Sequence, residues 1–148
     1  MKKPISVAQS ASAGEPVTVL TVAARGDLAR LDSILGHSRW TLLGAATLTE
    51  ARALLRRLPS VVLICEAVLP DGTWRDLLQY TLHLPVPPPV IVTADQADDY
   101  LWMEVLNGGG YNVLGKPFSE QEVYRMVSTA WLHRLDMAHA GARAAGAG

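Results

Sequence analysis

The sequence predicts an α/β protein built on a doubly wound parallel sheet of five strands with five helices. Short β-branched or apolar segments alternate along the chain with longer segments whose apolar residues recur at helical spacing. Several strand segments are apolar throughout, which is typical of strands buried on both faces of a parallel sheet. The chain has 148 residues, 49% of them hydrophobic and 18% charged, so it is long enough for one domain with its own core.

The strand and helix segments follow one another as five βα units. We expect strands at residues 17–22, 41–45, 61–65, 90–93 and 111–114. We expect helices at residues 27–35, 48–58, 73–82 and 97–107 and a long last helix from residue 119. Two of these helices begin with a capping-box pattern, a hydroxyl residue followed three positions later by Glu: Thr47 with Glu50, and Ser119 with Glu122.

Right-handed crossovers leave few ways to arrange five parallel strands, and the flavodoxin-like order 2-1-3-4-5 suits this pattern best. In such sheets a site forms at the carboxyl ends of the strands, near the switch between strands one and three. The residues that directly follow the strands are therefore the candidates for function.

The two ends of the chain differ in composition from the middle. Residues 1–15 are polar and small and lack periodicity, which indicates a disordered N-terminal arm. Residues 16–137 are expected to form the domain. Residues 138–148 are rich in Ala and Gly, so they are expected to form a flexible tail or the start of a linker.

Composition excludes several classes of function. The formal net charge is −1, so no basic field points to direct nucleic-acid binding. A single cysteine, Cys65, excludes an internal disulfide and a cysteine-based metal cluster, and the four histidines show no ligand spacing. No segment has the length of a membrane span, and no apolar run follows the basic start. We expect a cytoplasmic protein without a metal site.

Three segments at the ends of predicted strands resemble response-regulator receiver domains. They are residues 63–72 (Leu-Ile-Cys-Glu-Ala-Val-Leu-Pro-Asp-Gly), 89–94 (Pro-Val-Ile-Val-Thr-Ala) and 114–118 (Leu-Gly-Lys-Pro-Phe). The resemblance extends over roughly residues 17–134. It implies a CheY-like fold and a role in two-component, or phosphorelay, signal transduction.

The resemblance also implies a chemistry that can be compared residue by residue. Receivers accept a phosphoryl group on an aspartate after the third strand, with Mg²⁺ held by that aspartate and by an acidic pair after the first strand. Glu66 stands at the acceptor position, and Ala23 and Ala24 stand at the acidic pair. Alanine offers no oxygen ligand to Mg²⁺, so no magnesium cofactor is expected.

Other parts of the family's site are retained. Thr93 matches the hydroxyl that contacts the phosphoryl group, and Lys116 matches the cation that neutralises it. Lys116-Pro117 matches a peptide bond that is often cis in the family. The hypothesis is that Glu66 pairs directly with Lys116 and imitates the phosphorylated state, while Arg25 supplies positive charge in place of Mg²⁺. The alternative is a purely structural pair in a scaffold without a preferred state.

The family commonly binds partners through the fourth helix, fifth strand and fifth helix. Four aromatic residues in these elements are candidate anchors for a homodimer, a sensor kinase or an output domain: Tyr100, Trp102, Tyr111 and Tyr124. The position of the family's switching aromatic residue in the fifth strand holds Val113, so the usual relay is not expected.

These features predict an atypical receiver, or pseudo-receiver, which is a non-enzymatic module that binds other proteins without being phosphorylated. One alternative is a sensor that binds a small ligand or anion through Lys116, Thr93 and Arg25. A conventional phosphorylated receiver is the other, and Ala23 and Ala24 argue against it.

Overall fold

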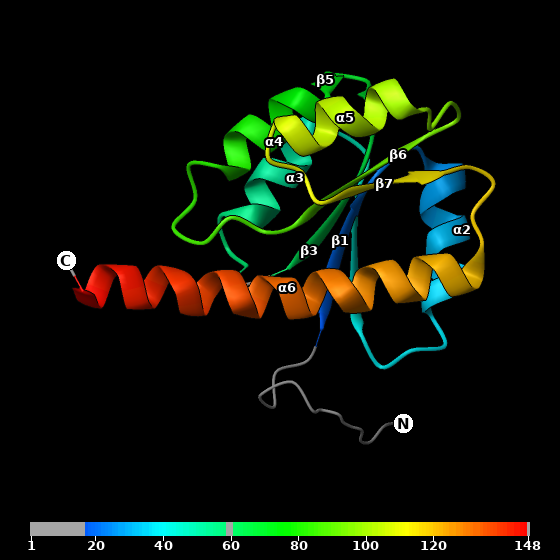
Figure 1. Cartoon of the computed structure of the whole chain (residues 1–148). Coiled ribbons are helices and arrows are strands. Elements are labelled where there is room, and N and C mark those ends of the chain that lie inside the picture. The colour runs from blue at the N-terminus through cyan, green and yellow to red at the C-terminus, as the bar shows by residue number, and fades with distance from the viewer. Residues whose placement is uncertain (1–16, 59–60, 148) are drawn as a thin grey trace.

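The computed structural model describes residues 17–58 and 61–147, with side chains described up to residue 134. Its central sheet consists of five parallel strands in the order β2-β1-β3-β6-β7, which confirms the predicted topology (Figure 1). These strands are β1 (Thr18–Val22), β2 (Thr41–Ala45), β3 (Val62–Glu66), β6 (Val90–Ala94) and β7 (Asn112–Gly115). A small antiparallel hairpin, β4 (Val68–Leu69) and β5 (Gly72–Thr73), surrounds the predicted turn.

Helices cover both faces of the sheet, as expected for a doubly wound fold. They are α2 (Arg25–Leu35), α3 (Leu48–Leu55), α4 (Trp74–Thr81), α5 (Asp99–Asn107) and α6 (Glu120–Ala147). In Figure 1, α3, α4 and α5 lie on one side of the sheet, and α2 and α6 lie on the other. Helix α2 begins two residues earlier than predicted, so the first turn of α2 lies closer to the end of β1.

The core consists of two apolar layers separated by the sheet, because successive strand residues point to opposite faces. Leu63 and Cys65 of β3 belong to the layer under α3, α4 and α5, whereas Val62 and Ile64 belong to the layer under α2 and α6. Each side chain of this size that is removed from water contributes roughly 1.5–3 kcal/mol. The buried sheet therefore holds the carboxyl ends of the strands in fixed positions.

The predicted hydroxyl caps are present at both helix starts. Thr47 Oγ1 accepts a hydrogen bond from the Glu50 amide at 3.1 Å, and Ser119 Oγ accepts one from the Glu122 amide at 3.4 Å. Glu50 Oε1 accepts from the amide of Ala46, not from that of Thr47, at 2.8 Å. These bonds satisfy amide groups that the first helical turn leaves without partners.

The C-terminal segment, residues 138–148, was expected to be a flexible tail or the start of a linker, but most of it is helical in the structure. Helix α6 continues to Ala147, through most of the segment that was expected to be a flexible tail. This segment is rich in alanine, the residue with the highest helix propensity, which outweighs the cost of its glycines. Whether the segment moves stays a prediction, and the expected N-terminal arm, residues 1–15, lies outside the described residues.

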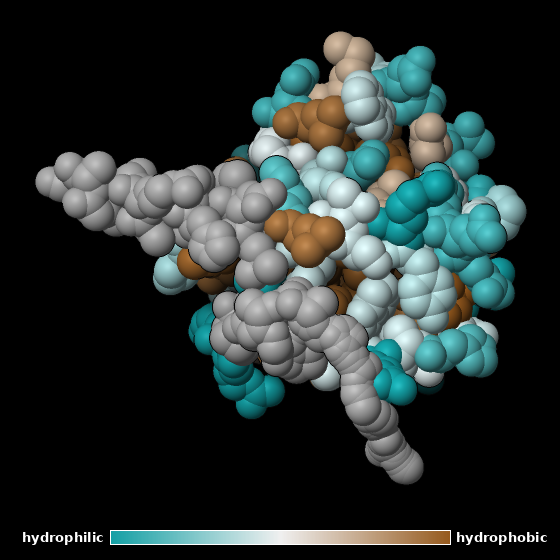
Figure 2. Space-filling view, turned by 60° about the horizontal axis from the view of Figure 1, so that its bottom comes forward, coloured by the Kyte–Doolittle hydropathy of each residue, from teal (hydrophilic) through white to brown (hydrophobic). Residues whose placement is uncertain are grey.

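Polar and apolar side chains are interspersed on the surface of the described residues. On the face seen in Figure 2, hydrophobic side chains form small separate patches between hydrophilic ones. None of the helices in the described part of the chain combines the length and apolar character needed to cross a bilayer.

Candidate functional site

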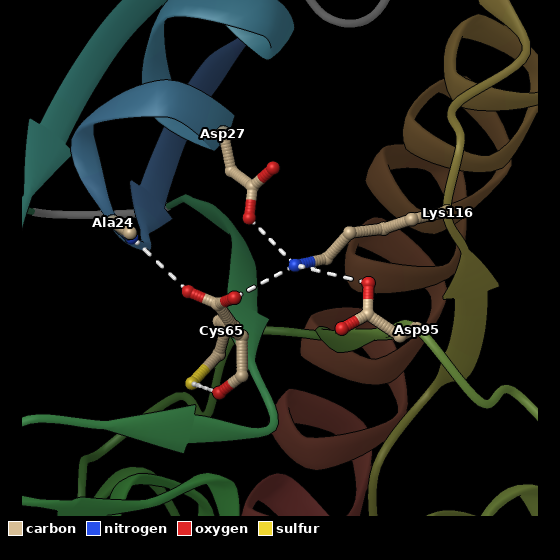
Figure 3. Close-up of polar contacts among 6 residues, drawn as sticks. Ala24, Asp27, Cys65, Asp95 and Lys116 are labelled. Carbon is tan, nitrogen blue, oxygen red and sulfur yellow. Dashed lines mark hydrogen bonds and ion pairs between the residues drawn. The ribbon is translucent and has the colours of Figure 1, made fainter.

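Four side chains meet at the carboxyl edge of the sheet, around the amino group of Lys116 (Figure 3). Lys116 Nζ donates to Glu66 Oε2 at 2.7 Å and to Asp27 Oδ2 at 2.6 Å. Asp95 Oδ1 lies 4.0 Å from the same nitrogen. The predicted pairing of Glu66 with Lys116 is therefore confirmed, and three carboxylates surround one cation.

Both carboxylate oxygens of Glu66 are engaged. Glu66 is the last residue of β3, and its Oε1 accepts a hydrogen bond from the Ala24 amide at 3.1 Å. Ala24 is the N-cap residue of α2 and has no side chain that could cap the helix. The Glu66 carboxylate thus lies at the N-terminus of α2, where the helix dipole favours negative charge.

Asp27 is a site residue that the sequence did not reveal. It lies in the first turn of α2, three residues after Ala24, and reaches Lys116 although 89 positions separate the two in the chain. Asp27 does not directly follow a strand, which is where the sequence predicts the residues of the site. An acidic residue within one helical turn of a strand end was the available signal.

Burial and the nearby negative charges have opposite effects on the pKa of Lys116. Burial disfavours the ammonium ion and lowers its pKa, but the hydrogen bonds and negative charges of Asp27 and Glu66 together outweigh that effect. The pKa of Lys116 therefore lies above its ordinary value of 10.5, and the amino group is charged at neutral pH.

Thr93 and Pro117 lie beside the cluster, as the family resemblance implies. Thr93 is the register partner of Glu66 on the neighbouring strand and is buried. The Lys116-Pro117 peptide bond is cis, and the Lys116 amide donates to the Ala94 carbonyl at 3.1 Å. These contacts place the backbone of Lys116 at the end of β6.

Arg25 does not join the cluster. Its side chain is exposed, and within residues 17–58 and 61–134 it makes no recorded hydrogen bond or ion pair. The expected replacement of Mg²⁺ by Arg25 is therefore not seen, because α2 begins at this residue and its side chain points to solvent. Lys116 itself supplies the positive charge that contacts Glu66.

Two other residues near the site have structural roles. Cys65 is buried, and burial, with a smaller effect of the Glu66 charge, raises the pKa of its thiol to about 12, as expected for an inert core residue. Asp71, in the turn between β4 and β5, points away from the cluster. Its carboxylate accepts hydrogen bonds from the amides of Leu48 and Thr49, at 2.7 and 3.0 Å, and so caps α3.

The four candidate interface residues do not lie together. Tyr100 and Trp102 on α5 are exposed, and Trp102 Nε1 donates to Asn112 Oδ1 on β7 at 3.2 Å. Tyr111 is partly buried, and its ring lies tilted against the His133 ring of α6 with centroids 5.3 Å apart.

Tyr124 has different surroundings. It is partly buried and packs against Trp40, in the segment before β2, with ring centroids 5.3 Å apart. Tyr124 lies on α6 and contacts the connection between α2 and β2, whereas the other three residues lie on α5 or directly before β7.

Comparison with known proteins agrees with this geometry. No family model matches the chain. The response regulator protein PilR of Pseudomonas aeruginosa is 32% identical over 101 residues, which cover 68% of this chain and 22% of the relative. The probable transcriptional regulatory protein TcrX of Mycobacterium tuberculosis is 34% identical over 113 residues, covering 74% of this chain and 47% of the relative. The chain thus spans less than half the length of either relative.

Solved structures give the same result. The signal receiver domain of an HD domain-containing protein from Pseudomonas fluorescens superposes with a TM-score of 0.74 at 26% identity, covering 84% of this chain and 92% of that domain. The chain is a response-regulator receiver domain. The chemotaxis response regulator CheY4 of Vibrio cholerae shares the receiver fold, with a TM-score of 0.71 at 17% identity over 78% of this chain and 99% of CheY4.

The receiver family's magnesium site is not reproduced by the residues of this domain. Ala23 and Ala24 carry no side-chain oxygen, and Ala23 is buried. Glu66 and Asp27, which have suitable oxygens, are in contact with the Lys116 ammonium group. Among the residues whose side chains are described, no group of His, Cys, Asp and Glu has the geometry of a metal site. Receiver domains are signalling modules and not classical enzymes.

Proposed function

We propose that this receiver domain acts as a pseudo-receiver, a protein-interaction module that signals without accepting a phosphoryl group. The observation that carries the proposal is the contact of Lys116 with Glu66 and Asp27 at the acceptor position. The lysine that would neutralise an incoming phosphoryl group is already neutralised by side chains of the same domain. A cytoplasmic location and two-component signalling belong to the same proposal.

The charge balance of the site supports phosphorylation independence. One ammonium group faces three carboxylates, two of them in direct contact with it. A phosphoryl group carries a charge of roughly −1.5 to −2 near neutral pH, so the excess of carboxylates repels it. Phosphoryl transfer also depends on a cation that spreads the charge, and Ala23 and Ala24 provide no ligand for one.

The test of this proposal is direct phosphorylation of the whole chain. The protein is incubated with acetyl phosphate and Mg²⁺, and its intact mass is measured beside a receiver that has aspartate at the acceptor position. We expect no mass change in this protein and one added phosphoryl group in the control. Magnesium-dependent addition to this chain would show that it is a conventional receiver.

The same site argues against the anion-sensor alternative. An anion would have to displace Glu66 and Asp27 from Lys116, and Arg25 lies outside the cluster. Titration with inorganic phosphate, followed through amide signals in NMR spectra, distinguishes the two functions. Saturable shifts at Thr93 and Lys116 would favour a sensor, whereas the proposal expects none.

We further propose that Glu66 imitates the phosphorylated state and favours a homodimer through α5, β7 and α6. Exposed apolar side chains on α5 support this surface, since Trp102, Met103 and Leu106 are at least 36% exposed. The bond from Trp102 to Asn112 fixes the indole across α5 and β7. A rigid, amphipathic aromatic residue of this kind is a common interface anchor.

Sedimentation measurements over a range of concentrations test both parts of this proposal. Trp102→Ala is expected to weaken self-association at least about tenfold, whereas Val68→Ala, at an exposed position on the hairpin, is expected to leave it unchanged. A protein that stays monomeric at millimolar concentration would rule out the dimer.

Glu66→Gln tests the imitation itself. It keeps the size of the side chain but removes the charge that faces Lys116, so self-association is expected to weaken at least about fivefold. Asp32→Asn, at an exposed carboxylate on α2, is the control. Unchanged self-association in Glu66→Gln would leave the pair a structural feature only.

A further inference from the structure

The outer edge of β2 is an unpaired strand edge. The strand order places β2 at one end of the sheet, and no strand within residues 17–58 and 61–147 pairs with its outer side. The Thr41 amide donates to the Val17 carbonyl, and the Ala45 carbonyl accepts from the Ala23 amide. The backbone groups of the odd-numbered residues of β2 therefore face β1. Because backbone groups alternate in direction along a strand, the intervening Leu42 and Gly44 point theirs outward.

This edge carries none of the usual protection against pairing. The sequence of β2 is Thr-Leu-Leu-Gly-Ala, without a charged residue or a proline. Natural proteins commonly place lysine, proline or a bulge on exposed edges, because open N–H and C=O groups recruit other strands. An open edge without these features indicates a surface that can accept a further strand.

A groove with a volume of about 260 Å³ lies beside this edge, between α2 and β2. Polar and apolar atoms contribute about equally to its walls, and the apolar residues that line it come from both elements: Leu28, Ala29, Leu31, Leu35, Leu42, Leu43 and Gly44. A Cβ atom on Gly44 would lie 3.4 Å from a methyl carbon of Leu28. The missing side chain at Gly44 therefore keeps the space between helix and strand open.

One charged residue lines the groove. Asp32 is exposed, and its carboxylate makes no recorded hydrogen bond or ion pair within the described part of the chain. A second copy of β2, paired along the same edge, would bring no positive charge, since β2 is uncharged. The free carboxylate is complementary to a partner strand that carries a basic residue.

We propose that this groove binds an extended, basic peptide segment of a partner protein as a sixth strand of the sheet. The segment pairs with the outward backbone groups of Leu42 and Gly44. It inserts an apolar side chain between α2 and β2 and places a lysine or arginine near Asp32. Strand addition gives affinity through the backbone and specificity through alternate side chains. The site lies at the opposite edge of the sheet from β7 and does not depend on the proposed function.

The first experiment uses a seven-residue peptide of alternating valine and lysine as the probe. Titrated into the isotope-labelled full chain, it is expected to shift the amide signals of Leu42 and Gly44 saturably and to slow their hydrogen exchange. A peptide of alternating valine and glutamate is expected to bind at least about tenfold more weakly, because its carboxylates face Asp32.

Three variants locate the binding. Gly44→Val fills the groove next to Leu28 and is expected to weaken binding at least about tenfold. Asp32→Asn is expected to remove most of the preference for lysine over glutamate. Gly26→Val, at an exposed glycine with no atom within 4 Å of an added Cβ, is the matched control. Circular dichroism and thermal melting check that each variant folds.

Several results would overturn the proposal. They are amide shifts confined to other residues, equal binding of the two peptides, and full binding by Gly44→Val. Self-association that protects Leu42 and Gly44 from exchange without peptide would instead assign the edge to a second copy of this chain.

Discussion

The two halves of the carboxyl edge of the sheet differ in a way that explains the proposed function. After β1, where receivers hold their metal, the chain has Ala23 and Ala24. At the ends of β3 and β6 and directly after β7 it has Glu66, Thr93 and Lys116, each of which can meet a phosphoryl group or imitate one. In the second half, the Lys116 ammonium group and the Glu66 carboxylate neutralise each other.

The largest expected effect comes from rebuilding the metal half. The Ala24 amide lies 3.1 Å from Glu66 Oε1, so an aspartate at position 24 brings its oxygens close to the acceptor position. The double variant Ala24→Asp with Glu66→Asp is expected to gain magnesium-dependent addition of a phosphoryl group from acetyl phosphate, measured by intact mass. Ala24→Asn with Glu66→Asp is the control without the added charge. No gain in the double variant would mean that more than the metal half separates this domain from a conventional receiver.

Replacing Lys116 removes the cation that contacts Glu66 and Asp27 in the second half of the edge. Lys116→Met leaves Glu66 and Asp27 partly buried without their cation, and their side chains are only 19% and 26% exposed. We expect a loss of about 2 kcal/mol in the free energy of unfolding, measured by urea denaturation. Arg25→Ala, at an exposed cation outside the cluster, is expected to change this free energy by less than about 0.5 kcal/mol. Equal effects of the two substitutions would contradict the special position of Lys116.

The contacts of Lys116 predict that the stability of the folded protein depends on pH in the alkaline range. Because the pKa of Lys116 is higher in the folded protein than its ordinary value of 10.5, its contribution to stability is complete below that pH. The contribution is lost as pH rises through the raised pKa. The stability difference between wild type and Lys116→Met is therefore expected to shrink above about pH 10.5, measured by urea denaturation at several pH values. Tyr111 and Tyr124, whose pKa values burial also raises, titrate in both proteins and cancel in the difference.

The smallest effect is expected at Asp71, which follows β3 but belongs to neither half of the site. Hydrogen bonds, above all the one from the Leu48 amide, lower the pKa of Asp71 below its ordinary value of 3.8. Its stabilising effect is therefore present above pH 3.8 and is lost as pH falls through the lowered pKa. Asp71→Asn is expected to be less stable than wild type at neutral pH, with a difference that narrows in acid thermal melts. A difference that persists at the lowest pH would assign the effect to shape and not to charge.

Much of the fold and part of the site followed from local patterns in the sequence. Helical and strand periodicity predicted the five strands, crossover handedness favoured their order, and the capping-box pattern predicted the hydroxyl caps at Thr47 and Ser119. Because parallel strands end at one edge, residues after different strands were expected to meet, and the contact of Glu66 with Lys116 confirms this. These features depend on spacing along the chain, which the sequence displays directly.

Other features were decided only by the tertiary structure. Asp27 joins Lys116 and Arg25 does not, because the exact start of α2 fixes which side chains of its first turn face the sheet edge. Asp71 caps a helix that begins 23 residues before it, and Tyr124 packs against the distant Trp40. The sequence by itself determined which five strands form the central sheet and which five helices cover it. The direction of side chains between distant elements depends on packing that local spacing does not encode.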